Sequence, residues 1–224
     1  MGTTITITSA DRFQLSAYRA EPEGRVRGGV VVVQEIFGVN AHIREVADRY
    51  AAAGYLAIAP AVFDRAQRGV DLGYTPEDMQ TGFALAMGEV QFTDVVADVA
   101  AAGRVAAEAG KVGVVGYCFG GLVTAASAIQ SGDVFAAAAS YYGGNSVSLA
   151  SQTPVIPMIC HYGEKDSYIP PTDVDKIRSG WSDAIVYTYP ADHGFNCDQR
   201  AAFHPQSAAI AQARTFRFFG DVLG

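Results

Sequence analysis

Residues Lys111 to Gly121 read KVGVVGYCFGG, a short apolar run that leads into a cysteine flanked by glycines. Residues 112–115 are typical of a buried strand, and the small residues 121–128 are typical of a helix. Between them, Gly116, Cys118 and Gly120 form the pattern G-x-C-x-G. Glycines here let a strand and a helix pass close together without a Cβ clash. We therefore expect a sharp, strained turn that lifts the Cys118 sulfur above a sheet.

A turn of this kind suits a nucleophile. The N–H of Phe119 and the N-terminus of the following helix would face negative charge that develops on a substrate. A second interpretation stays open, because a free cysteine in a protein is often an inert core residue. The motif therefore needs partners elsewhere in the chain.

Length and composition predict one α/β domain that spans residues 1–224. The chain is 50% hydrophobic and contains 24 glycines, which suits a sizeable core with many tight turns. Its net charge is −7 and no basic cluster is present, so we expect no nucleic-acid partner. The sequence contains neither a secretory signal nor an apolar run long enough for a membrane span, so we expect a cytoplasmic protein without a membrane partner.

The three cysteines are Cys118, Cys160 and Cys197. An odd and sparse set does not form a disulfide framework. None of them shares the CxxC spacing of a structural zinc site or a thiol redox motif, so we expect neither a metal nor a redox function.

Apolar runs alternate with helical segments along the chain, which predicts βαβ crossovers, a mainly parallel central sheet and helices on both faces. The loops at the carboxyl ends of the strands are then the expected place for a site. The predicted strands are 4–8, 13–19, 29–33, 55–59, 112–115, 135–142, 154–162 and 184–189. The predicted helices are 41–53, a helix from Pro76, 92–109, 121–128 and 206–219.

A thiol nucleophile needs a base, and the base needs an orienting group. His193 follows the last predicted strand, and Asp166 follows the strand before it. The order Cys118, Asp166, His193 is the nucleophile, acid, histidine order of α/β-hydrolases, which usually carry serine at the first position. The alternatives are a turn or cap residue for Asp166 and a surface-loop residue for His193.

The other histidines have simpler interpretations. His42, at the start of a predicted helix, is expected to be exposed or to cap the helix. His161, inside a predicted strand, is expected to be a core residue, and His204 lies in a late loop. Glu35 directly follows the strand 29–33 in an apolar loop, an unusual place for a charge that serves solubility. It is either part of the site or a structural salt bridge.

Together these segments resemble the dienelactone hydrolase family, the carboxymethylenebutenolidases. The motifs that carry the resemblance are QEIFGVN at 34–40, GYCFGG at 116–121, GEKD at 163–166 and DHGF at 192–195. The resemblance implies the α/β-hydrolase fold and cleavage of a cyclic enol ester without a cofactor. It also implies a triad of Cys118, Asp166 and His193, activation of the cysteine by Glu35, and oxyanion donors at the N–H groups of Ile36 and Phe119.

The chain departs from the best-known members of this family, which hold a substrate carboxylate with two arginines. The corresponding segments here are Met79–Gly82 and Asn196–Cys197, which contain no arginine. Arg65, Arg68 and Arg200 lie on plausible rim loops, and we interpret each as a solvated charge. A substrate carboxylate is therefore expected to help binding little.

The sequence thus predicts a hydrolase of a small ester or enol lactone that forms a thiol ester on Cys118. The alternative is a ligand-binding module that keeps the hydrolase pocket without catalysis.

Overall fold

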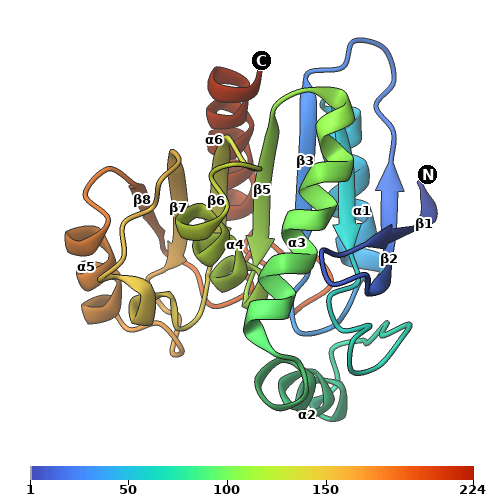
Figure 1. Cartoon of the computed structure of the whole chain (residues 1–224). Coiled ribbons are helices and arrows are strands. Elements are labelled where there is room, and N and C mark those ends of the chain that lie inside the picture. Colours follow the sequence, from blue (N-terminus) through green and yellow to red (C-terminus); the bar gives the residue numbers. More distant parts are fainter. Residues whose placement is uncertain (1) are drawn as a thin grey trace.

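A computed structural model describes residues 2–224 and contains one eight-stranded sheet in the order β1-β2-β4-β3-β5-β6-β7-β8. The strands are β1 (Thr3–Thr8), β2 (Gln14–Ala20), β3 (Gly28–Val33), β4 (Tyr55–Pro60), β5 (Val112–Tyr117), β6 (Ala137–Tyr141), β7 (Met158–Gly163) and β8 (Ile185–Tyr189). β2 pairs antiparallel with both β1 and β4, and the remaining neighbours are parallel. The predicted mainly parallel sheet is confirmed (Figure 1).

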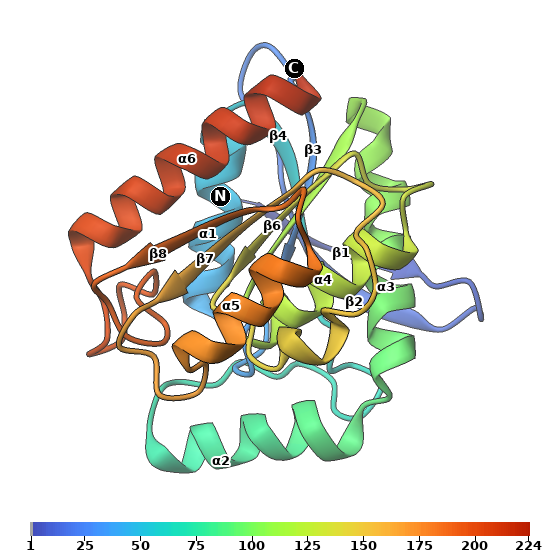
Figure 2. The ribbon, with the colours of Figure 1, turned by 90° about the vertical axis from the view of Figure 1, so that its left-hand side faces the viewer.

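Helices cover both faces of this sheet, as predicted. The α-helices are α1 (Ala41–Ala52), α2 (Pro76–Ala84), α3 (Phe92–Ala106), α4 (Phe119–Gln130), α5 (Pro171–Gly180) and α6 (Pro205–Leu223), with shorter turns η1 (Leu85–Glu89), η2 (Ala107–Ala109) and η3 (Ser146–Leu149). Figures 1 and 2 show α1 and α6 on one face and α3 and α4 on the other. The π-helix η1 extends α2 directly, and this pair lies away from the sheet, below the ends of the central strands (Figure 1).

The core is centred on β3 and β5, which pair in parallel register with Val31 opposite Val114. Every residue of both strands is buried. Strands covered on two faces need continuous apolar runs rather than alternation, and this explains the run GGVVVV in β3. The two strands therefore give the loops that follow them a rigid base.

Among the differences from the prediction, three concern β7, β6 and α5. β7 begins at Met158 rather than at Pro154, and proline has no N–H for the ladder at positions 154 and 157. β6 is confined to Ala137–Tyr141, shorter than the predicted 135–142. α5, which starts at Pro171 after Pro170, was not among the predicted helices.

Two further features bear on the class of protein. Within residues 2–224, every helix is too short or too polar to cross a bilayer. All three cysteines are free, as expected for a chain without a disulfide framework.

Candidate active site

Cys118 lies at the turn between β5 and α4, with backbone angles φ 56° and ψ −115°. A positive φ in a residue other than glycine is strained, at a cost of about 1–3 kcal/mol. The strain agrees with the expected sharp turn and is held by the backbone, because the Cys118 N–H donates to the carbonyl of Tyr141 at 3.0 Å. The turn places the thiol at the carboxyl edge of the sheet.

Gly116 and Gly120 make this turn possible by allowing two close backbone approaches. A Cβ on Gly116 would overlap the carbonyl of Gly120, and a Cβ on Gly120 would overlap the carbonyls of Val33 and Gln34. Any side chain at either position would therefore push β5, α4 or the loop after β3 out of place. The G-x-C-x-G pattern is thus a steric requirement of this turn.

His193 and Asp166 are joined by a hydrogen bond of 2.7 Å from Nδ1 of the histidine to Oδ2 of the carboxylate. The other oxygen, Oδ1, accepts the N–H of Tyr168 at 2.9 Å. The loops that carry the pair are also tied together, because the Lys165 N–H donates to the carbonyl of Ala191 at 3.0 Å. With Nδ1 engaged by Asp166, the other ring nitrogen, Nε2, is left for a partner in the pocket.

The surroundings of His193 favour its charged form. Burial alone lowers the pKa of the ring, but the Cys118 sulfur and the Asp166 carboxylate outweigh this effect and raise the pKa to about 10. The two other acids near this histidine have different positions. Glu164 is exposed, and Asp192 accepts the backbone N–H of His193 rather than bonding to its ring.

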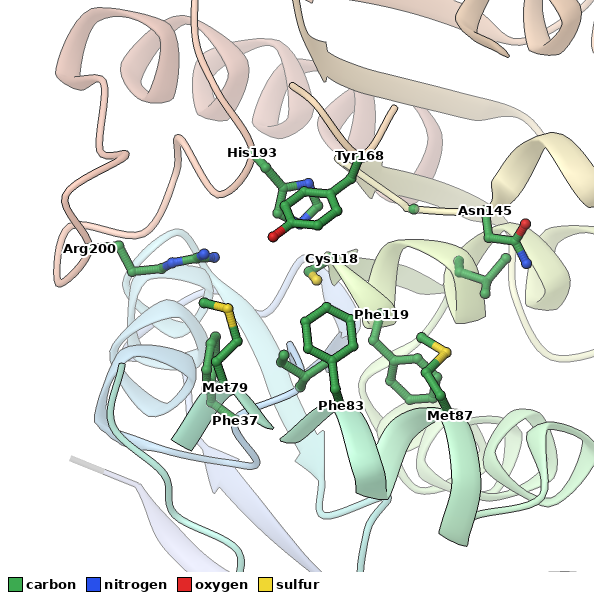
Figure 3. Close-up of a pocket in the computed structure, with 13 residues that line it drawn as sticks. Phe37, Met79, Phe83, Met87, Cys118, Phe119, Asn145, Tyr168, His193 and Arg200 are labelled. Carbon is green, nitrogen blue, oxygen red and sulfur yellow. The ribbon is translucent and has the colours of Figure 1, made fainter. Parts of the chain in front are cut away.

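Cys118 and His193 open onto one pocket of ≈ 210 Å³. In Figure 3 the sulfur lies at its centre, with His193 and Tyr168 on one side and Phe83 on the other. The residues that line the pocket are mostly apolar: Ile36, Phe37, Met79, Phe83, Met87, Cys118, Phe119, Leu122, Gly144, Asn145, Tyr168, His193 and Arg200. The small volume and apolar walls suit a small organic ligand.

One wall of the pocket is supplied by α2 and η1. Met79, Phe83 and Met87 repeat every four residues and face Cys118 together (Figure 3). They were not among the predicted site residues, although their spacing is typical of one helix face. Phe83 is 39% and Met87 63% exposed, so this wall is open to solvent on its outer side.

The two residues predicted as oxyanion donors belong to the wall of the pocket. Ile36 and Phe119 both line the pocket beside Cys118. Phe119 is the first residue of α4, and the N–H groups of a first helical turn have no acceptor within the helix. The Phe119 N–H is therefore available to an oxygen bound at the sulfur.

Glu35 is buried, with 1% of its surface exposed, and does not line the pocket. Its Oε1 is paired with Nη1 of Arg200 at 3.4 Å. The Arg200 side chain is only 14% exposed and lines the pocket (Figure 3). The interpretation of Arg200 as a solvated charge is therefore wrong: the loop after β8 folds back and carries the guanidinium to the site.

Two other ionisable residues also differ from expectation. Arg65 is not solvated, because it forms a buried structural pair with Asp98 at 2.8 Å. His42 neither caps its helix nor reaches solvent: it is fully buried and contacts Asp198, and Asn40 caps α1 instead.

Arg68 is 62% exposed, as predicted.

His161 is a buried core residue, as expected. Its two ring nitrogens contact the hydroxyls of Tyr189 at 2.8 Å and Thr215 at 2.9 Å. Burial lowers the pKa of this ring to about 3. His161 is therefore neutral and fully bonded, which leaves His193 as the histidine of the pocket.

The sheet order, the strained turn after β5 and the histidine–carboxylate pair define the chain as an α/β-hydrolase. A model of the "Dienelactone hydrolase family" matches residues 15–223, and the chain belongs to that family.

Individual relatives agree with this assignment. The chain is 34% identical to a protein of Synechocystis sp. named "Putative carboxymethylenebutenolidase", over 97% of this chain and 96% of that protein. A crystal structure described as "Putative Dienelactone Hydrolase" from Klebsiella pneumoniae is 32% identical, with a TM-score of 0.83, over 97% of this chain and 98% of that one. A dienelactone hydrolase-like promiscuous phosphotriesterase from metagenomic libraries shares the fold at 20% identity, with a TM-score of 0.77, over 100% of this chain and 99% of that one.

Proposed function

We propose that the protein hydrolyses a small ester or enol lactone through a thiol ester on Cys118, without a cofactor. The observation that carries this proposal is the 2.7 Å bond between His193 and Asp166 beside the strained Cys118, at the base of an apolar pocket. A nucleophile, a base and an orienting acid in this relation are the minimum set for covalent acyl transfer.

In the first half of the reaction, the proton of the Cys118 thiol passes to Nε2 of His193, which gives the charged ring that its surroundings favour, and the sulfur attacks the carbonyl carbon. Glu35 is proposed to assist this proton removal through Oε1, the oxygen that faces the pocket residue Arg200. The N–H groups of Ile36 and Phe119 stabilise the tetrahedral oxyanion. The carbon–oxygen bond of the ester then breaks, and the leaving oxygen regains a proton from His193. Asp166 stabilises the imidazolium throughout.

In the second half, water attacks the thiol ester and gives its proton to His193. The carbon–sulfur bond breaks, the acid is released, and the proton returns to Cys118. An enol lactone suits these reaction steps better than an alkyl ester does. Its leaving group is a stabilised enolate, which competes poorly with a thiolate for the acyl group.

The pocket further favours a substrate that carries a carboxylate. Its walls are apolar, and Arg200 adds a positive charge to them. Burial alone lowers the pKa of the guanidinium, but Glu35 and neighbouring groups outweigh this effect and raise it, so the charge is kept. A carboxylate bonded to an arginine gains about 1.5–3 kcal/mol. Arg200 thus offers the substrate contact that the segments Met79–Gly82 and Asn196–Cys197 lack.

The direct test is hydrolysis of an activated ester and an enol lactone by wild type, Cys118→Ala and Cys160→Ala. We expect Cys118→Ala to abolish turnover and to change the free energy of unfolding by only about 1 kcal/mol, as an ordinary substitution does. Cys160 lies in the core, so its variant controls for loss of a thiol. A Cys118→Ala variant that keeps a tenth of the rate would remove Cys118 from the proposed role.

A further inference from the structure

Glu35, His42 and Cys197 form a second cluster, which is separate from the pocket lining and completely buried. One potential ligand atom from each residue lies within 4.8 Å of the other two. We propose that this cluster binds one divalent cation of the zinc class, through Glu35 Oε2, His42 Nε2 and Cys197 Sγ.

Two of these three atoms are left without a partner in the protein. Glu35 Oε2 and His42 Nε2 are both buried and neither makes a hydrogen bond within residues 2–224. A buried polar atom without a partner is costly, and such atoms in a folded protein call for an explanation. A cation between them would satisfy both at once.

The contacts of His42 indicate which of its ring nitrogens carries the proton. Its Nδ1 lies 3.1 Å from Asp198 Oδ1. The other oxygen of Asp198, Oδ2, lies 2.6 Å from Arg49 Nη2, so Asp198 forms an ion pair with Arg49 and can only accept from His42. The proton of a neutral His42 is therefore on Nδ1, and the lone pair of Nε2 faces the cluster. His42 Nε2 and Glu35 Oε2 are then two acceptor atoms without a donor in one buried cluster, and a cation would satisfy both.

Asp198 also supplies the outer contact that metal-bound histidines usually have. A carboxylate that accepts the other ring N–H fixes the ring and makes it a better ligand. Asp198 is itself held by Arg49, whose Nη2 lies 2.6 Å from Oδ2. The chain of Arg49, Asp198 and His42 thus orients Nε2 toward Glu35 and Cys197.

The two oxygens of Glu35 have separate tasks in this arrangement. Oε1 is paired with Arg200, and Oε2 is free for the ion. Cys197 donates its S–H to the Tyr74 hydroxyl at 3.3 Å and would release that proton to solvent when it binds the ion. The thiolate and the carboxylate then contribute two negative charges, one of which is shared with Arg200.

The donor set selects the kind of cation. Sulfur and imidazole favour zinc and related transition metals over Mg²⁺ or Ca²⁺, which prefer oxygen. Zinc bonds of about 2.0–2.3 Å place neighbouring ligand atoms about 3.3–3.8 Å apart, so atoms that now lie within 4.8 Å of one another would approach by at most about 1–1.5 Å. Three protein ligands leave the fourth position to water.

The test is a titration of the purified full chain, first freed of metal with a chelator, with Co²⁺ as a spectroscopic substitute for Zn²⁺. We expect a thiolate-to-cobalt absorption band that saturates at one ion per chain and disappears when Zn²⁺ is added. This readout does not depend on hydrolysis, so it stands apart from the proposed function in which Glu35 also takes part.

Variants locate the site. Cys197→Ser is expected to remove the band, and Asp198→Asn to weaken binding about 10–100-fold, as loss of such an outer contact does. Circular dichroism and thermal melting check that each variant folds. Asp198→Asn is expected to change the stability of the fold little, because Asp198 is partly exposed. Cys118→Ser is the matched control, because Cys118 and His193 are the other cysteine–histidine pair, and it is expected to keep the band.

Absence of a cobalt band in the wild type would overturn the proposal. A band that survives Cys197→Ser and is lost in Cys118→Ser would also overturn it, because the ion would then be bound by the catalytic pair.

Discussion

Arg200 Nη1 lies 3.4 Å from Glu35 Oε1, although 165 residues separate the two in the sequence. The pair joins the loop after β8 to the loop after β3, and both loops border the pocket that contains Cys118. Arg200 thus brings a positive charge to the pocket, although the segments Met79–Gly82 and Asn196–Cys197 contain no arginine. Arg200 is therefore the residue that we propose for recognition of an anionic substrate.

The first prediction concerns this arginine. Arg200→Gln is expected to lower kcat/KM for a lactone that carries a carboxylate by about ten- to a hundredfold, the equivalent of one charged hydrogen bond. A matched lactone without the carboxylate is expected to lose much less, since it has no charge to pair. The ratio between the two substrates is the measurement, because it cancels any general loss of folded protein.

Arg68→Gln is the control for this experiment, since Arg68 is exposed and lies outside the pocket. An unchanged substrate ratio in Arg200→Gln would mean that Arg200 only neutralises Glu35.

The second prediction concerns Asp166. Asp166→Asn disturbs the bond to Nδ1 of His193 and is expected to reduce kcat by about 10–10³-fold. This is less than the roughly 10⁴-fold loss known for the same change in a Ser-His-Asp triad, because a thiol needs less help from its base. Glu164→Gln, an exposed neighbour in the same loop, is expected to keep the wild-type rate. If the two variants behaved alike, Asp166 would not orient the histidine.

The third prediction is a pH dependence of stability. The pKa of His193 is raised from 6.5 to about 10 in the folded chain. The folded ring holds its proton more tightly than the unfolded chain does, so its contribution to stability is fully present below about pH 6.5 and is lost as the pH rises through about 10. Urea unfolding from pH 6.5 to 10 is expected to show a falling free energy of unfolding, with a shallower fall in His193→Gln. Equal slopes in the two proteins would show that His193 has no raised pKa.

The fourth prediction concerns the wall formed by α2 and η1. Phe83→Ala is expected to reduce kcat/KM for apolar esters about fivefold, since a side chain already 39% exposed gives up only part of the roughly 1.5–3 kcal/mol of a full burial. Gln80→Ala, on an exposed position of the same helix, is the control. Equal rates for Phe83→Ala and wild type would mean that substrates do not touch this wall.

The parts of the fold that could be predicted from the sequence depend on local patterns. The runs that form β3 and β5 are continuous and apolar because both faces are covered, and the strained turn at Cys118 follows from the glycines beside it. The order of Cys118, Asp166 and His193 along the strands was informative, because parallel strands bring their carboxyl ends to one edge. α5 was missed because its sequence, PTDVDKIRSG, carries a weak apolar pattern.

The roles of Arg200 and His42 could not be predicted, because each depends on contacts between distant loops. Arg200 reaches the pocket only because residues 194–204 fold back toward Glu35. His42 lies inside the protein because Asp198, 156 residues away, accepts its ring N–H. No local spacing signals either contact. The same loop carries Cys197, so the proposed cation site was hidden in the same way.

The central claim, that Cys118 carries the acyl group, is tested most directly by trapping the intermediate. Wild-type protein is mixed with a reactive ester, quenched in acid during turnover, digested and analysed by mass spectrometry. We predict an acyl adduct on the peptide that contains Cys118 and none on those of Cys160 or Cys197, formed and lost at the rate of turnover. Steady hydrolysis with no adduct on Cys118 would contradict the claim.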